Sequence, residues 1–195
     1  MLTRAQLAVD VRRRQPRGFI SHARSDNIAR HEYTLCTPET AALVAHRLGE
    51  RHFLEMPYRQ PMEWGGLRLT TFPAGHCLGS AMLLAEDDEH GRLLYTGDFK
   101  LGPSVTAEQA ELPADILVIE STYGDPHYRL PRREEAVAQL IAVVSEAIER
   151  KTVPVVLAYT LGKAQEVTKL LTNAGFPVVQ HRAVYAVSLV YQRCG

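Results

Sequence analysis

Three short apolar segments in the first half of this 195-residue chain each run straight into a histidine or an aspartate beside residues that permit tight turns. These polar residues are His22, His76 and Asp98, and Asp26 follows His22 in the same cluster. Imidazole nitrogens and carboxylate oxygens are the ligands that zinc, manganese or iron accept. A fold that gathers these segment ends at one edge of a sheet would therefore build a metal site.

Each of these residues also has a plain structural interpretation. A lone histidine at a strand end is usually a polar residue satisfied by its neighbours, and an aspartate after a glycine usually stabilises a turn. Four other histidines lie in helical or loop contexts without ligand-type partners, namely His31, His46, His52 and His90. Spacing alone therefore leaves both interpretations open, a metal site and a set of unrelated polar residues.

The first half of the chain has the pattern of short strands interrupted by one helix. The apolar runs predict strands at residues 7–9, 18–21, 33–36, 67–72, 81–85 and 93–96. Thr37 as an N-cap, followed by Pro38, predicts a helix that runs to about Leu48. A glycine-rich turn at 64–66 and an acidic hairpin loop at 86–91 connect the later strands.

The second half alternates strands with helices. Strands are expected at 115–119, 153–158 and 178–180, and helices at 132–150, 162–173 and 183–193. Strand 115–119 is almost entirely apolar, which is typical of a strand covered on both faces. The first of these helices has an apolar face expected to be buried, formed by Ala136, Val137, Leu140, Ile141, Val144 and Ala147. This βαβαβ order predicts parallel pairing in an α/β fold. The last helix has no stop signal before Gly195, as if a further unit were beginning there, so we expect that the remainder of this unit is missing.

Composition narrows the classes of function. Hydrophobic residues make up 46% of the chain, enough for a core, so disorder is excluded. Lys+Arg and Asp+Glu are both 22, so any contact with nucleic acid must come from a local patch. The one dense basic run is Arg12-Arg13-Arg14 with Arg17; such a run is more often a solvated face than a guide for a nucleic-acid backbone.

Three widely spaced cysteines argue against a disulfide scaffold and for a reducing compartment. No apolar run approaches the length of a membrane span, and the N-terminus lacks the apolar region of a secretory signal. We therefore expect a cytoplasmic protein that does not associate with membranes.

Residues 21–27 resemble the signature loop of the metallo-β-lactamase superfamily, His-x-His-x-Asp-His. His22 and Asp26 match this pattern, whereas Arg24 and Asn27 occupy the other two histidine positions. The Gly75-His76 pair resembles the next metal-ligand motif of the family, and Thr96-Gly97-Asp98 resembles the motif whose aspartate bridges two metals. Asp10 resembles the structural aspartate that precedes the signature loop.

Two further segments resemble the β-CASP branch of nucleases, which includes ribonuclease J, Artemis-like nucleases, the pre-mRNA 3′-end-processing endonuclease and a bacterial ligase-associated exonuclease. Glu120, in segment 119–125, takes the position of the branch's acidic motif; the alternative is a strand-end or helix-cap carboxylate. Segment 159–166 resembles the start of the inserted domain. There Gly162 and Lys163 either open a helix with a solvated lysine or bind a phosphate through helix N–H groups and the lysine charge.

The resemblance implies an incomplete metallo-β-lactamase αββα sandwich over residues 1–150, followed by the beginning of a β-CASP-like domain over residues 151–195. In the intact family two zinc ions activate a water and neutralise phosphate charge. Their ligands would include His22, Asp26, His76 and Asp98, and the last three would be catalytic.

The departures at Arg24 and Asn27 imply one metal or none, zinc or alternatively manganese. Arg24 is expected to pair bidentately with Asp98 or Asp26 and so replace a missing cation. The resemblance thus predicts an impaired metal-dependent nuclease acting on DNA or RNA, with a DNA ligase or an RNA-processing protein as partner. The alternatives are an inactive relative that binds nucleic acid or protein, and a fragment without function.

Overall fold

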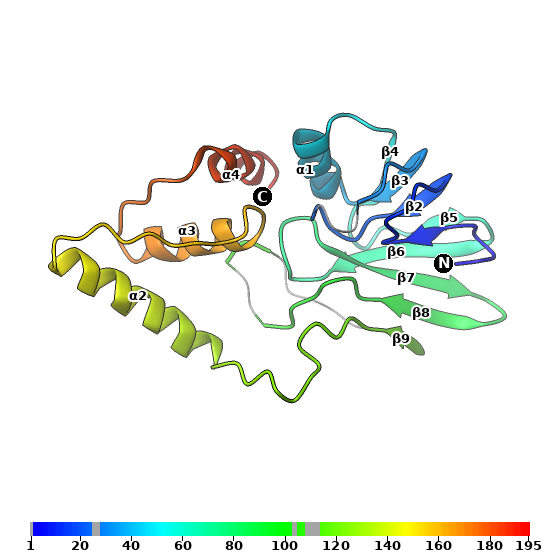
Figure 1. Ribbon diagram of the computed structural model, residues 1–195. Coiled ribbons are helices and arrows are strands. Elements are labelled where there is room, and N and C mark those ends of the chain that lie inside the picture. The colour runs from blue at the N-terminus through cyan, green and yellow to red at the C-terminus, as the bar shows by residue number, and fades with distance from the viewer. Residues whose placement is uncertain (1, 25–27, 103–104, 108–113) are drawn as a thin grey trace.

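The computed structural model describes residues 2–24, 28–102, 105–107 and 114–195, and contains two β-sheets and four helices (Figure 1). The first sheet is parallel, in the order β1 (Ala8–Val9), β2 (Arg17–Phe19), β3 (Tyr33–Cys36) and β4 (Phe53–Glu55). The second sheet is in the order β5 (Met62–Trp64), β6 (Leu67–Pro73), β7 (Ala81–Asp87), β8 (Gly91–Tyr95) and β9 (Ile116–Val118). Its neighbours are antiparallel except β9, which is parallel to β8.

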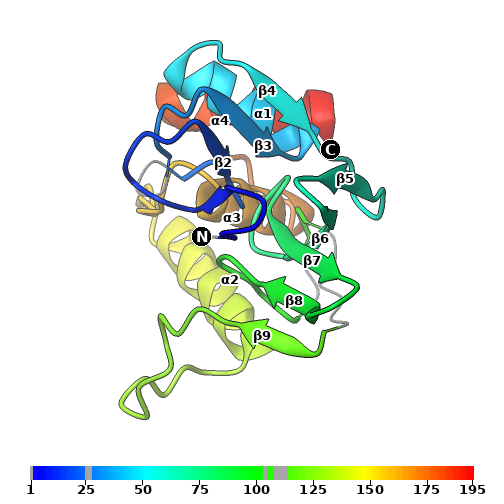
Figure 2. The ribbon, with the colours of Figure 1, turned by 90° about the vertical axis from the view of Figure 1, so that its right-hand side faces the viewer.

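The main core lies where the inner faces of the two sheets meet (Figure 2). Phe19 and Leu35 of the first sheet share one buried cluster with Leu69 and Leu83 of the second. Burying a side chain of this size stabilises a fold by about 1.5–3 kcal/mol relative to leaving it exposed. The contact between the sheets therefore holds the ends of β2, β6 and β8 in fixed positions.

The helices are α1 (Pro38–Leu48), α2 (Arg133–Glu149), α3 (Lys163–Asn173) and α4 (Arg182–Cys194). Helix α4 packs on α1 through a buried cluster that joins Val187 and Val190 to Leu43 and Val44. Helix α1 also contacts the first sheet, where Ala41 packs with Cys36 of β3. Among the described residues, no helix combines the length and apolar character needed to cross a membrane.

The start of α1 holds the loop between β6 and β7. The Thr37 hydroxyl caps the helix by accepting from the Thr40 amide at 3.2 Å, as the sequence predicts. The Thr37 and Thr40 hydroxyls also donate to the Gly79 carbonyl at 2.7 and 2.8 Å. Gly79 has φ +73°, and a Cβ there would lie 2.6 Å from the Thr40 amide nitrogen. The helix start and the loop can therefore approach this closely only with glycine at that position.

The strands expected in the first half all form, with ends that differ by at most two residues. The helix there has the expected bounds, and the turn at 64–66 joins β5 to β6 with positive φ at both glycines. Strands β4 and β5 were not expected, because each has three residues and includes a charged side chain, which obscures alternation. Short strands of this kind form because a longer neighbour provides the hydrogen bonds.

The predicted βαβαβ pairing in the second half is wrong. Residues 153–158 and 178–180 pair with no strand in the part of the chain that the structure describes, and Val153, Leu157 and Val179 are 89%, 92% and 98% exposed. Strand β9 does form, but the expectation that both its faces are covered is also wrong, since Ile116 and Leu117 are each 50% exposed at the sheet edge. A β-prone segment becomes a strand only where a neighbour offers its backbone groups.

Helix α2 forms as expected, but its apolar face is only partly covered. Of the six residues expected to be buried, Val144 is buried, Ala136 is exposed and the others are partly buried. The helix extends away from both sheets (Figure 1). Helices α3 and α4 begin and end within one residue of their expected limits. The predicted boundary between domains at residue 150 stays a prediction.

Candidate metal centre

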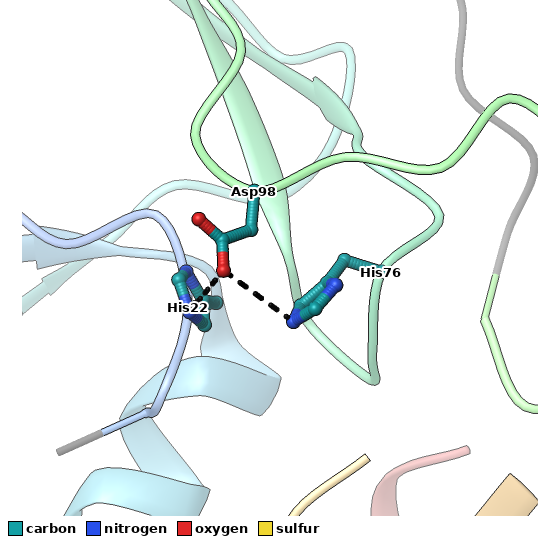
Figure 3. A group of neighbouring side chains, drawn as sticks. All are labelled: His22, His76 and Asp98. Carbon is teal, nitrogen blue, oxygen red and sulfur yellow. Dashed lines mark ion pairs between the residues drawn. The ribbon is translucent and has the colours of Figure 1, made fainter. Parts of the chain in front are cut away.

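Three of the four predicted ligand residues lie together at the ends of β2, β6 and β8 (Figure 3). The Asp98 Oδ2 atom is 3.6 Å from His22 Nε2 and 3.8 Å from His76 Nε2. One ligand atom from each residue lies within 4.8 Å of the others, and the two imidazole rings meet edge to face with centroids 5.2 Å apart. Asp26 and Asn27 lie outside the described residues.

A chain of hydrogen bonds orients His22. The His22 Nδ1 atom and the Ser21 hydroxyl share a hydrogen bond of 2.9 Å. The Ser21 amide donates to one oxygen of Asp10 at 2.9 Å, and the Tyr95 hydroxyl donates to the other at 2.9 Å. Outer partners of this kind fix the ring orientation of metal-binding histidines. Asp10 thus connects β8 to the segment that carries His22, a placement that suits a structural aspartate.

Ser80 stabilises the loop between β6 and β7 that carries His76, here called the His76 loop. The Ser80 hydroxyl accepts from the amides of His76 and Cys77, each at 3.1 Å, and Gly75 adopts φ +73°. Burial lowers the pKa of His76, with the Asp98 charge opposing this effect and the Arg24 and Lys163 charges adding to it. A lowered pKa favours the neutral imidazole, which is the form that binds metals. Burial raises the pKa of Cys77 to about 12, so its thiol stays protonated and is no competing ligand.

Gly97 brings Asp98 close to His22. It has φ +55°, and a Cβ at this position would lie 2.6 Å from the Ser21 hydroxyl oxygen. Any side chain there would push the end of β8 away from Ser21, and with it the Asp98 carboxylate. The glycine of the Thr96-Gly97-Asp98 motif therefore has a geometric role that the sequence alone did not reveal.

The three donors fit one divalent metal ion. Zinc binds histidine nitrogen and carboxylate oxygen at about 2.0–2.2 Å, so ligand atoms of one ion lie between about 3 and 4 Å apart. The distances of 3.6 and 3.8 Å from Asp98 Oδ2 to the two imidazoles lie in this range. His22 is buried, whereas His76 and Asp98 are partly exposed, so the group opens to solvent on one side.

Arg24 contacts the oxygen that faces both imidazoles. Its Nη1 atom lies 3.5 Å from Asp98 Oδ2, and its guanidinium lies 5.1 Å from the centre of the Tyr159 ring. The contact with Asp98 uses a single pair of atoms, so the bidentate geometry expected for this pair is not formed. Arg24 nevertheless puts a positive charge beside the oxygen that a metal would use.

The residues predicted to bind substrate lie around this group without joining it. The Glu120 carboxylate accepts from the Thr122 amide at 2.6 Å, which is typical of a turn after a strand. Its charge slightly opposes the lowering of the His76 pKa. Gly162, with φ +84°, begins α3 against the His76 loop, and a Cβ there would lie 3.2 Å from the Cys77 Cβ.

Two basic residues that the sequence analysis missed, Lys100 and Arg133, lie beside the predicted Lys163 because all three pair with Glu166. Only Glu166 had a sequence signal, as part of the segment that opens the predicted inserted domain. In the basic run, Arg14 pairs with Glu32 at 3.6 Å and Arg17 lies over the Trp64 ring at 5.5 Å. A second group of possible ligands, Asp87, Glu89 and His90, lies on the hairpin between β7 and β8, where two of the three are exposed.

No family model matches the chain, but curated proteins do. A probable DNA ligase from Opitutus terrae is 39% identical over 184 residues, which are 93% of this chain and 18% of the ligase. Cleavage and polyadenylation specificity factor subunit 3 from Dictyostelium discoideum is 34% identical over 142 residues, covering 70% of this chain and 18% of that protein. The 5′ exonuclease Apollo from Gallus gallus is 32% identical over 177 residues, covering 83% and 37%.

The chain thus spans less than two fifths of the length of these relatives. A crystal structure of a protein of unknown function from Enterococcus faecalis V583 superposes with a TM-score of 0.61 at 16% sequence identity, covering 88% of this chain and 48% of that chain. At this identity the likeness concerns the fold alone. It agrees with a mixed α/β sandwich built on two sheets.

Proposed function

Since the chain belongs to the metallo-β-lactamase/β-CASP nuclease family, we propose that it is a metal-dependent phosphodiester-cleaving protein whose activity is impaired by its altered ligands. The observation that carries this proposal is the convergence of His22, His76 and Asp98 on one point. The proposed substrate is DNA or RNA, since named relatives include a 5′ exonuclease, an RNase J-like protein and endoribonucleases. A DNA ligase or an RNA-processing protein is the proposed partner.

In this proposal His22, His76 and Asp98 hold the metal. A bound zinc or manganese ion would supply an activated water and neutralise charge on the phosphate. The protein's own contribution is orientation and charge: the Ser21 and Asp10 hydrogen bonds hold the His22 ring, and burial lowers the pKa of His76, which favours its neutral form. Gly162 and Lys163, at the start of α3 beside the His76 loop, would contact a substrate phosphate.

Impairment follows from the positions of Arg24 and Asn27. Arginine cannot ligate a metal, because its guanidinium stays protonated. Its charge repels a divalent cation at the oxygen of Asp98 that it contacts. By resemblance, Asp26 and Asp98 alone would remain for a second metal, with Asn27 offering an amide oxygen that suits manganese better than zinc. We therefore propose at most one weakly bound metal.

The first experiment measures metal content and cleavage in parallel. The purified chain is loaded with zinc or manganese, freed of excess metal and analysed by elemental mass spectrometry. We expect at most one ion per chain, reduced in His76→Ala and unchanged in His46→Ala, which removes an exposed histidine from α1. Labelled single-stranded DNA and RNA should be cut slowly or not at all. Two retained metals per chain, or rapid cleavage that a chelator stops, would contradict the proposed impairment. Equal metal content in wild type and His76→Ala would contradict the proposed ligands.

The second candidate function is a non-catalytic relative that binds nucleic acid. The contact between Arg24 and Asp98 favours it, because a guanidinium can neutralise the carboxylate without any metal. A chain that retains no metal and cuts no substrate, yet binds oligonucleotides in a salt-sensitive manner, would support this second function.

We also propose that the protein works in a reducing compartment, the cytoplasm. The three free cysteines, two of them buried, agree with this proposal.

A further inference from the structure

Three cations surround one buried carboxylate at the start of α3. Glu166 Oε1 lies 2.9 Å from Lys100 Nζ and 2.6 Å from Arg133 Nη2, and Glu166 Oε2 lies 2.7 Å from Lys163 Nζ. The Glu166 side chain is 9% exposed, whereas that of Lys163 is 57% exposed. The cations come from three separate segments: the loop after β8, the first turn of α2 and the first turn of α3.

The charges of this cluster do not balance. One carboxylate offsets one of the three positive charges, so the group has a net charge of +2. Cations held this close repel one another, and a further anion between them would relieve the repulsion. The three cations also keep N–H donors for a further anion. An ammonium has three N–H groups and a guanidinium has five, and each cation contacts Glu166 through one nitrogen atom.

The cluster lies next to the candidate metal centre. Lys100 follows Asp98 by two residues, and its amide donates at 2.8 Å to the carbonyl of Ala74, two residues before His76. Gly162, which precedes Lys163, begins α3 against the loop that carries His76, since a Cβ at Gly162 would lie 3.2 Å from the Cys77 Cβ. A polyanion bound at the metal centre would therefore extend directly to these three cations.

We propose that Lys100, Arg133 and Lys163 form a phosphate subsite that binds the backbone of a nucleic-acid strand beside the metal centre, and that Glu166 is the positioning residue that holds the three cations together. This proposal rests on the proposed function and deepens it, because it names the contacts to the neighbouring phosphate. The recognition is of phosphodiester charge, so it serves DNA and RNA alike.

Replacing Glu166 by glutamine separates positioning from simple charge. Glu166→Gln keeps the size of the side chain and raises the net charge of the cluster from +2 to +3. If charge alone determines binding, the variant should bind a nucleic acid more tightly. If Glu166 positions the cations, the variant should bind more weakly despite its extra positive charge, because the amide keeps only one acceptor oxygen and turns N–H donors towards the cations that the other oxygen held.

The test is fluorescence anisotropy with a labelled single-stranded oligothymidylate, over a series of salt concentrations and in the presence of a chelator. We expect Lys100→Met and Arg133→Met each to weaken binding about tenfold, as for loss of a charge-assisted contact. Each should also reduce the slope of log affinity against log salt by about 0.7. Glu166→Gln should weaken binding, and Lys169→Met, which removes an exposed lysine from the same helix, should leave it unchanged.

Several outcomes would overturn the subsite. These are unchanged or tighter binding by Glu166→Gln, an effect of Lys169→Met as large as that of Lys100→Met, or no binding by the wild type at low salt. Thermal melting identifies a variant that fails to fold. If Glu166→Gln does not fold, Lys100→Met and Arg133→Met test the subsite instead. The subsite is wrong if both of these variants have the melting temperature, affinity and salt slope of the wild type.

The chelator makes this test independent of the proposed metal site. If the wild type binds the oligonucleotide as expected but retains no more metal than His76→Ala, the subsite is supported and the proposed metal ligands are contradicted. A chain that retains metal and binds no oligonucleotide would contradict the subsite alone.

Discussion

The Arg24 guanidinium lies 3.5 Å from the Asp98 oxygen that also faces His22 and His76. In the proposed site, an arginine in place of a histidine ligand would remove a donor atom and add a charge of the same sign as the metal. The Asp98 carboxylate therefore keeps a positive partner whether or not a metal is bound. At the scale of single residues, we therefore expect a change at Arg24 to alter metal binding although Arg24 is no ligand.

Replacing Arg24 by histidine should increase the affinity for zinc by at least about tenfold, equal to about 1.4 kcal/mol, because the change removes a repulsive charge and supplies an imidazole. Competition with a chromogenic chelator measures the affinity. Arg24→Gln is the matched control, since it removes the charge without adding a nitrogen ligand, and should give a smaller increase. Equal affinities for the wild type and Arg24→His would mean that Arg24 does not occupy a ligand position.

Gly97 is the second position where one residue determines the site. Gly97→Ala should destabilise the protein by about 2 kcal/mol or more, through strain at positive φ and a clash with Ser21. Gly49→Ala is the control, because Gly49 also has positive φ but no atom lies within 4 Å of its added Cβ. Urea denaturation compares the two variants. A smaller loss for Gly97→Ala than for Gly49→Ala would show that the approach to Ser21 is not tight.

At the scale of elements, Glu166 joins α3 to α2 and to the loop after β8. Burial alone would raise the pKa of Glu166, but hydrogen bonds from Lys163, Lys100 and Arg133 lower it from 4.5 to about 2. Because the folded-state pKa lies below the unfolded one, this carboxylate stabilises the fold above pH 4.5, and the contribution disappears as the pH falls towards 2.

The free energy of unfolding should therefore decrease between pH 4.5 and 2, with a contribution from Glu166 of about 2 kcal/mol. Glu166→Gln should lack this part of the decrease, because an amide does not titrate. Denaturation at a series of pH values measures it. The control is Glu146→Gln, which removes an exposed ion pair with Arg150 at the end of α2 and should retain most of the acid dependence. An identical dependence in wild type and Glu166→Gln would contradict the role of this carboxylate.

At the scale of the whole molecule, several large apolar side chains outside the two packed sheets' core are exposed. They lie on the edge strand β9, on α2 and on segment 153–158, and include Ile116, Leu117, Val118, Val143, Val155 and Leu157. Exposed apolar side chains in such number favour association. The buried core instead gathers where the sheets meet and where α4 packs on α1.

The chain at high concentration should therefore associate, and Val155→Lys with Leu157→Lys should reduce the association without loss of stability. Light scattering and thermal melting measure the two properties. Val190→Thr, at a fully buried position of α4, is the contrasting control and should lower the melting temperature. A wild type that remains monomeric at high concentration, or a lysine variant that unfolds, would show that these side chains are covered.

The sequence by itself determined the features that depend on near neighbours along the chain. The Thr37 cap and Pro38 predicted the start of α1, glycines predicted the turn before β6, and alternation predicted the longer strands. The motifs around His22, His76 and Asp98 identified residues that the structure brings within 4.8 Å of one another. These inferences worked because caps, turns and periodicity depend on contacts between residues a few positions apart. The motif residues could be predicted because proteins that share such motifs also share the fold that brings the residues together.

Only the tertiary structure decided what covers each element and which charges meet. Residues 153–158 have the composition of a buried strand, yet Val153 and Leu157 lie exposed, because pairing needs a neighbouring backbone that composition does not specify. Lys100, Arg133 and Glu166 are far apart in the sequence and carry no common pattern, but three elements bring them into contact. Burial and charge clusters depend on surfaces supplied by distant segments, and these surfaces exist only once the sheets and helices have packed.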